Sequence, residues 1–130
     1  MLDKADRKAF VTESFEISAR SDRMGYRLSG RELRSAKGAE LISTAVLTGT
    51  VQVPPGGGPI VLLADRQTTG GYPMVAQVIK ADLGAVAQLR PGNEIRFTEV
   101  TIDDAHEALR YVEKVVHELK GAGDRVPSRP

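Results

Sequence analysis

The segment ADRQTTGGYP, residues 64–73, brings together side chains that could bind a small polar molecule. Arg66 carries a planar guanidinium, which can hold a carboxylate or phosphate through two hydrogen bonds. Gln67 can both donate to and accept from an amide or ureido group. Tyr72 adds an aromatic face and a phenol, and Pro73 after it favours an extended backbone. These residue types in one short segment indicate a candidate binding or catalytic site.

The rest of the segment can be explained in two ways. Gly70 and Gly71 allow the backbone to approach a ligand closely, or simply to turn. The side chains of Asp65, Thr68 and Thr69 could face a ligand, or could bond locally within a polar turn. Side-chain chemistry alone favours the polar turn.

A second polar segment, SDRMGYR, also has two explanations. Strand alternation places Arg23 and Arg27 on one face, where both arginines could line a shared cleft. Alternatively, Asp22 and Arg23 form a turn while Met24 and Tyr26 fill the core. The sequence supports these two explanations about equally.

Alternating apolar and polar residues predict the elements that would position both segments. The last element is an amphipathic helix whose apolar residues recur every three or four positions from Ile102 to Leu119. Thr101 or Asp103 is its expected N-cap, and Gly121 its expected end. Its apolar stripe is predicted to pack in the core, with the docking of a partner as the alternative. The shorter predicted elements are strands at 10–19, 24–29, 50–53, 60–64, 75–79 and 94–98 and a helix at 81–89.

Composition indicates one globular domain and excludes several kinds of site. The 130 residues include 18 basic and 17 acidic side chains, which gives no electrostatic basis for binding nucleic acid or an anionic membrane. The sequence has no cysteine, which excludes thiolate catalysis and cysteine-ligated metals and fits a cytoplasmic location. His106 and His117 lie about 16 Å apart on the predicted helix, at ~1.5 Å per residue, too far to share a metal.

Three regions are expected along the chain. Residues 1–9 are charged and alternate in sign, so they are predicted to form a flexible lead-in without the apolar core of a secretory signal. Residues 10–120 are predicted to form the domain, and residues 121–130 a mobile tail. No run reaches the roughly 18 apolar residues of a membrane span.

Three stretches resemble the C-terminal part of the biotin-dependent carboxyltransferase family, which is also known as allophanate hydrolase subunit 2 or urea amidolyase-related. They are SDRMGYRLSG, GTVQVPPGGGPIVLLADRQTTGGYP and ADLGAVAQLRPGNEIRF, and the resemblance covers roughly residues 10–112. The family includes the third subunit of prokaryotic 5-oxoprolinase. The resemblance implies a mainly β fold, a cyclophilin-like antiparallel β-barrel with a short helix and a long C-terminal helix. It also implies that this chain corresponds to the C-terminal half of the usual family chain.

The resemblance implies a small ureido or lactam substrate, such as urea, allophanate or 5-oxoproline. Arg66 would hold an anionic group or polarise a carbonyl, and the amides of Gly70 and Gly71 could donate to an oxyanion. Gln67 and Thr68 would orient the amide, and Asp65 would position Arg66. The residues expected in catalysis are Arg66, Gln67 and Tyr72. Those expected in substrate binding are Asp65, Thr68, Thr69, Gly70, Gly71, Arg23 and Arg27.

The first functional hypothesis is therefore part of a multisubunit 5-oxoprolinase that opens the lactam with ATP and is inactive alone. The expected partners are a small subunit similar to allophanate hydrolase subunit 1 and a third subunit. The sequence has no G-x-x-x-x-G-K-[ST] pattern and no biotinyl-lysine motif, so ATP or carboxybiotin would be held elsewhere. The alternatives are the carboxyltransferase component of a urea carboxylase, a non-catalytic regulator that binds a kinase inhibitor, and a fragment that folds without activity.

Overall fold

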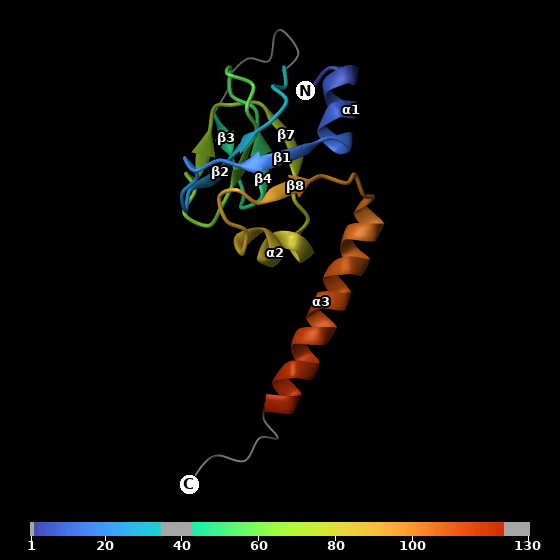
Figure 1. Cartoon of the computed structure of the whole chain (residues 1–130). Helices are drawn as coiled ribbons and strands as arrows, with labels where there is room; N and C mark the ends of the chain where they lie inside the picture. Colours follow the sequence, from blue (N-terminus) through green and yellow to red (C-terminus); the bar gives the residue numbers. More distant parts are fainter. Residues whose placement is uncertain (1, 35–42, 124–130) are drawn as a thin grey trace. The chain divides into compact units, whose positions relative to one another are not determined.

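The computed structural model describes residues 2–34 and 43–123, with side chains described as far as residue 121 (Figure 1). The chain divides into two compact units, Met1–Glu99 and Val100–Pro130, and each is described here by itself. Most of the tail predicted at 121–130 lies outside the described residues. Residues 121–123, however, belong to the last helix rather than to a tail.

The first unit is built on a six-stranded sheet in which every neighbouring pair of strands is antiparallel. The strand order is β7-β4-β5-β2-β1-β8, and the sheet curls into part of a barrel (Figure 1). Two short strands, β3 (Thr44–Ala45) and β6 (Thr69–Gly70), pair separately. The strands of the large sheet are β1 (Ser14–Ile17), β2 (Gly25–Ser29), β4 (Thr50–Gln52), β5 (Ile60–Leu62), β7 (Met74–Gln77) and β8 (Glu94–Arg96).

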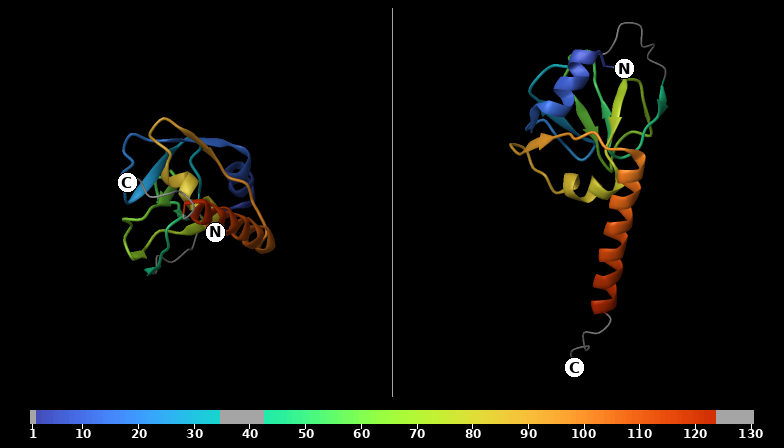
Figure 2. Two further views of the ribbon diagram at one scale, coloured as in Figure 1. Left: turned by 90° about the horizontal axis from the view of Figure 1, so that it is seen from below. Right: turned by 90° about the vertical axis from the view of Figure 1, so that its right-hand side faces the viewer.

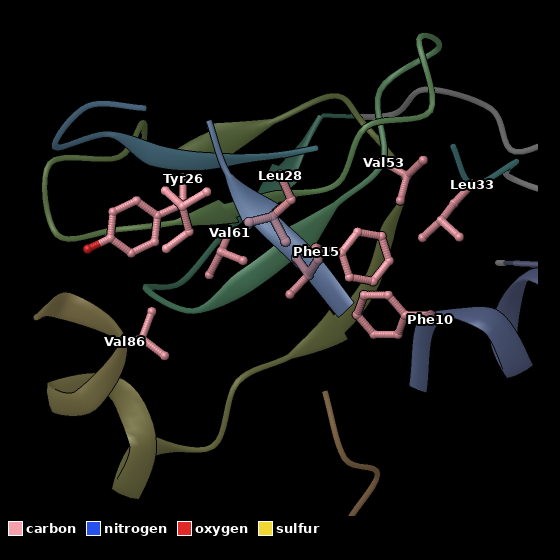
Figure 3. Close-up of a cluster of buried hydrophobic side chains, with 10 residues drawn as sticks. Phe10, Phe15, Tyr26, Leu28, Leu33, Val53, Val61 and Val86 are labelled. Atoms are coloured by element: carbon pink, nitrogen blue, oxygen red, sulfur yellow. The ribbon is translucent and has the colours of Figure 1, made fainter. Parts of the chain in front are cut away.

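Strand alternation decides which side chains form the core. Phe15 and Ile17 on β1 are almost fully buried, as predicted, and Val61 on β5 is fully buried. Ile60 and Leu62 are only half-buried, so β5 is not buried on both faces as its apolar sequence suggested. Burying each such aliphatic or aromatic side chain contributes about 1.5–3 kcal/mol. The core cluster contains Phe10, Phe15, Ile17, Tyr26, Leu28, Leu33, Val51, Val53, Val61 and Val86, most of which are labelled in Figure 3.

The first residues differ from the prediction, because helix α1 (Lys4–Thr12) replaces both the flexible lead-in and the start of the first strand. Asp3 caps the helix by accepting a hydrogen bond from Asp6 N at 2.8 Å. Asp6, Ala9 and Phe10 are spaced three and four residues apart, so they share one face, and all three are buried. Phe10 stacks on Phe97 at a ring separation of 4.4 Å.

Two short helical turns cover the other end of the core, so that Phe10 and Val86 lie at opposite ends of the cluster (Figure 3). They are η1 (Lys80–Asp82) and α2 (Leu83–Ala87), and they confirm the helix predicted at 81–89, although it is shorter than expected. Tyr26 ties this end to the sheet, because its hydroxyl donates to Leu89 O at 2.8 Å. Two further views in Figure 2 show α1 and α2 at different ends of the sheet.

The second unit is the helix α3 (Ile102–Gly123). A capping box begins it, in which Thr101 Oγ1 accepts from Asp104 N at 3.1 Å and Asp104 Oδ2 accepts from Thr101 N at 3.3 Å. Thr101 is therefore the N-cap, as predicted. The prediction that the apolar stripe packs in the core is wrong, because Val112, Val116 and Leu119 are exposed. Among the described residues, no helix is both long and apolar enough to cross a membrane.

Candidate functional site

The two polar segments of the sequence lie side by side. Strand β2 pairs with β5, with Gly25 opposite Leu62. The ladder continues past the end of β5, where Leu63 N donates to Met24 O at 3.0 Å and Asp65 N donates to Arg23 O at 3.2 Å. The ADRQTTGGYP segment thus begins directly beside SDRMGYR, although the two segments are far apart in the sequence.

A cavity of about 350 Å³ opens where these segments meet. Its floor is the face of the sheet that points away from the core. Arg27 on β2 is opposite Ile60 on β5, and Ile60 is opposite Gln52 on β4, so the three residues form one row across three strands. Gly25 and Leu62 form the next row, and all five residues line the cavity.

The wall of the cavity is the small β3–β6 sheet and the chain that follows it. Ala45 pairs with Thr69, and Val46 N donates to Thr68 O at 3.2 Å, so Val46 is held beside β6. Gly70 lies directly against the side-chain amide of Gln52, where no Cβ would fit. The residues that line this wall are Val46, Gln67, Thr69, Gly70, Gly71 and Tyr72.

The cavity brings together six of the predicted site residues and leaves out four. The six that line it are Arg27, Gln67, Thr69, Gly70, Gly71 and Tyr72. Asp65, Thr68 and Arg23 are exposed outside the lining. Arg66 is also outside the lining: its Nε donates to Val46 O at 3.3 Å and its Nη1 donates to Ala64 O at 3.4 Å. The guanidinium of Arg66 therefore braces the loop in this structure, and its part in catalysis stays a prediction.

The SDRMGYR segment combines both of its predicted explanations. Asp22 Oδ1 accepts from Met24 N at 2.8 Å and from Gly25 N at 3.3 Å, which makes a tight polar turn. Tyr26 enters the core, as the structural explanation predicted, whereas Met24 is exposed and lines the cavity. Arg27 lines the cavity but Arg23 does not, so the two arginines do not share this lining.

Sequence reasoning missed Gln52, which is 5% exposed and lines the cavity. Its Nε2 is buried and has no hydrogen-bond partner among the described residues. The sequence contained a signal, because Gln52 is the polar residue between Val51 and Val53, both of which face the core. The other lining residues that were not predicted are Asp22, Met24, Gly25, Val46, Ile60 and Leu62.

The charges that line the cavity belong to Asp22 and Arg27. The carboxylate of Asp22 is already engaged by two backbone N–H groups. Arg27 makes no ion pair with another residue of the described part of the chain, so it is the group able to attract an anion. Within the same part of the chain, no three His, Asp or Glu side chains cluster as a metal site would require.

Comparisons with known proteins agree with the resemblance seen in the sequence. Residues 1–99 match the family described as "Carboxyltransferase domain, subdomain A and B". The chain is 47% identical over 104 residues to a 5-oxoprolinase subunit of Haemophilus influenzae, which covers 80% of this chain and 34% of that protein. It is 42% identical over 122 residues to the 5-oxoprolinase subunit of the same name in Escherichia coli, covering 91% and 39%. The chain thus spans between a third and two-fifths of the length of these relatives.

Solved structures support the same assignment. The crystal structure of TTHA0988 superposes with a TM-score of 0.65 at 41% identity, over 75% of this chain and 19% of that one. The K. lactis urea amidolyase superposes with a TM-score of 0.78 at 21% identity, over 87% of this chain and 7% of that one, which shows a shared fold. Both the predicted family and the predicted mainly β fold with a long C-terminal helix are confirmed, and the chain belongs to the carboxyltransferase-domain family, subdomain A and B.

Proposed function

We propose that this chain supplies part of the substrate site of a 5-oxoprolinase, a multisubunit enzyme that opens a lactam with ATP. The observation that carries the proposal is the cavity, which joins the two polar segments in a chain that is 47% identical to a known 5-oxoprolinase subunit. Because the chain spans about a third of that relative, we expect partner surfaces to complete the site.

The chemistry of the cavity matches a small cyclic amide that carries an acid. A volume of about 350 Å³ is near the lower end of ligand pockets and suits a ligand of this size. Arg27 can hold the carboxylate of 5-oxoproline through its fork of donors. Thr69 and Gln67 offer hydrogen bonds to the polar edge of the ring, and Tyr72 offers an aromatic face.

The opening of a lactam by water places negative charge on the carbonyl oxygen as the C–N bond is attacked. Gly70 and Gly71 line the cavity, and their backbone N–H groups are the donors that we assign to this oxygen. The roles of Gln67 and Tyr72 are to orient the amide and to donate to the departing nitrogen. Arg66 supports this arrangement by bracing Val46 O.

The ATP of the reaction would be bound by other subunits, because this sequence has no phosphate-binding loop. The partners that we propose are a small subunit similar to allophanate hydrolase subunit 1 and a third subunit. The exposed apolar residues of α3 are available for such contacts.

The test is ATP hydrolysis stimulated by 5-oxoproline, measured with the partner subunits of a relative. This chain replaces the relative's full-length subunit in one reaction, and the full-length subunit is used in a parallel reaction. Stimulation by 5-oxoproline and not by urea in both reactions supports the proposal. Stimulation with the full-length subunit alone limits this chain to part of a site, and an absence of stimulation in both reactions contradicts the proposal.

A second candidate is the carboxyltransferase component of a urea carboxylase, which would receive carboxybiotin from another domain. It is favoured by the carboxyltransferase family itself and by the fold shared with urea amidolyase. Transfer of a carboxyl group from carboxybiotin to urea, measured with the same proteins, would identify this second function.

A further inference from the structure

We propose that Gln52 is the residue that recognises the amide edge of the ligand, with Arg27 recognising its acid across Ile60. This inference rests on the proposed function, because it takes a lactam carboxylate as the ligand. Gln52 lies outside both polar segments of the sequence, and it enters the cavity from the floor, whereas Gln67 and Tyr72 belong to the wall.

The first observation is the unpaired amide. Gln52 is 5% exposed, and its Nε2 is buried without a hydrogen-bond partner among the described residues. Buried polar groups are rarely left unpaired, because the hydrogen bonds lost with water are then not replaced. An unpaired donor on a cavity wall is therefore a position where a ligand atom can restore the missing bond.

A second glutamine in the same unit shows that this is not a general property of the sheet. Gln77 on β7 donates from Nε2 to Thr48 O at 2.9 Å and to Val78 O at 3.1 Å. Its Oε1 accepts from Thr50 Oγ1 at 2.9 Å. The sheet thus satisfies the amide of Gln77 internally and leaves Nε2 of Gln52 unsatisfied at the cavity.

The local backbone explains why Gln52 is held in this position. The register between β4 and β7 shifts between Val51 and Gln52, which marks an irregularity in the ladder at this residue. Gly70 then passes so close that a Cβ would collide with Gln52 Nε2. The amide is therefore fixed between β4 and β6, and its position is set before a ligand arrives.

The row of residues on the floor matches the shape of a lactam acid. Strands lie about 4.8 Å apart, so two strand spacings separate the backbones of Arg27 and Gln52 by roughly 10 Å. Ile60 lies between them in register and offers an apolar surface to the ring. A five-membered ring then fits over Ile60, with its carboxylate towards Arg27 and its N–H and C=O towards Gln52.

A primary amide is suited to the lactam edge because it donates and accepts side by side. The N–H and C=O of a small lactam are cis, so the edge can form two bonds with one glutamine side chain. An acid without this edge leaves Gln52 unpaired, and such a site rejects it strongly. Gln52 is therefore a specificity residue, and it takes no part in bond breaking.

The test uses the full-length 5-oxoprolinase subunit of the Escherichia coli relative with its partner subunits, carrying Gln52→Met at the position that aligns with this chain. Methionine keeps the length of the side chain and removes both hydrogen-bonding groups. We expect KM for 5-oxoproline to rise at least about tenfold, with KM for ATP unchanged and kcat changed less than about threefold. Gln88→Met, at an exposed residue outside the cavity, is the matched control and leaves all three parameters unchanged.

The outcomes separate the two proposals. If the unchanged complex shows no stimulation by 5-oxoproline, the proposed function fails, and this inference with it. If the unchanged complex is active and Gln52→Met leaves KM for 5-oxoproline as it was, Gln52 does not recognise the ligand and only this inference is overturned. Where Gln52→Met fails to assemble, Gln52→Glu decides in the same way, because it keeps the shape and removes the donor.

Discussion

Gly70 and Gln52 are in contact across the gap between the small sheet and the large one. A Cβ on Gly70 would collide with Gln52 Nε2 and would lie 3.2 Å from Val46 Cγ1. A Cβ on the next residue, Gly71, would have nothing within 4 Å. The two adjacent glycines of the TTGGYP sequence therefore have different requirements, although both line the cavity.

This difference predicts opposite tolerance to alanine. Gly70→Ala must displace either Gln52 or Val46, so we expect the free energy of unfolding to fall by about 1–3 kcal/mol. Gly71→Ala should change it by less than about 0.5 kcal/mol. Urea denaturation of both variants checks the prediction, and equal losses in the two variants would contradict the close packing of Gly70.

The acid at position 6 should make the stability of the fold depend on pH. The backbone N–H of Arg34 donates to Asp6 at 2.7 Å, and the Arg31 guanidinium donates at 3.1 Å. The hydrogen bond from Arg34 N, followed by the pairing with Arg31, lowers the pKa of Asp6 below its ordinary value of 3.8. A carboxylate whose pKa is lowered by folding stabilises the fold above pH 3.8, and this stabilisation is lost as the pH falls through the folded-state pKa.

We therefore expect Asp6→Asn to be less stable than the unchanged chain near neutral pH, with a smaller difference as the pH falls below 3.8. Thermal unfolding followed across this range is the measurement. Asp82→Asn is the matched control, because Asp82 makes no capping hydrogen bond and is not buried. A constant difference between Asp6→Asn and the unchanged chain at all pH values would show that Asp6 acts by packing alone.

The stacking of Phe10 on Phe97 attaches α1 to the end of the sheet. Phe97 also meets Phe15 edge-on at 6.1 Å, so the three rings form one cluster. Phe97 is half-buried, and Phe97→Ala should lower the free energy of unfolding by about 2 kcal/mol. Amide exchange in α1 should increase at the same time, whereas Tyr111→Ala, at a residue that is 70% exposed on α3, should change neither quantity.

The sequence predicts the strands well where alternation is regular. Tyr26 and Leu28 alternate with Arg27, and the structure places the first two in the core and Arg27 in the cavity. Prediction fails at α1, because the buried face of this helix contains the acid Asp6. An acid is buried there only because Arg31 and the backbone of Arg34 reach it from later in the chain, and no local pattern shows such partners.

The site shows a similar division. Residue types indicated the TTGGYP sequence correctly as part of a cavity wall, but they could not separate Arg27 from Arg66. Their different positions depend on Val46, whose carbonyl engages Arg66 because β3 pairs with β6. Gln52 was missed for a related reason: its burial requires Gly70 to cross over β4, which is a contact between residues distant in sequence.

The two arginines give the sharpest test of this arrangement. Arg27 has no ion pair with another described residue and lines the cavity, so Arg27→Ala should remove the group that holds the carboxylate. The loss of one charge-assisted contact corresponds to roughly a 10- to 100-fold rise in KM for 5-oxoproline, with little change in stability. Arg66→Ala should instead lower the free energy of unfolding by about 1 kcal/mol, because the bonds to Val46 O and Ala64 O brace the loop.

Steady-state ATP hydrolysis by the complete complex, together with urea denaturation of each variant, separates these effects. Arg96→Ala, at an exposed position on β8 away from the cavity, is the matched control for loss of a surface arginine. If Arg66→Ala raised KM or lowered kcat at unchanged stability, Arg66 would have to leave the two carbonyls and reach the substrate during turnover. The loop would then rearrange on binding, and the catalytic role first predicted for Arg66 would belong to that rearranged state.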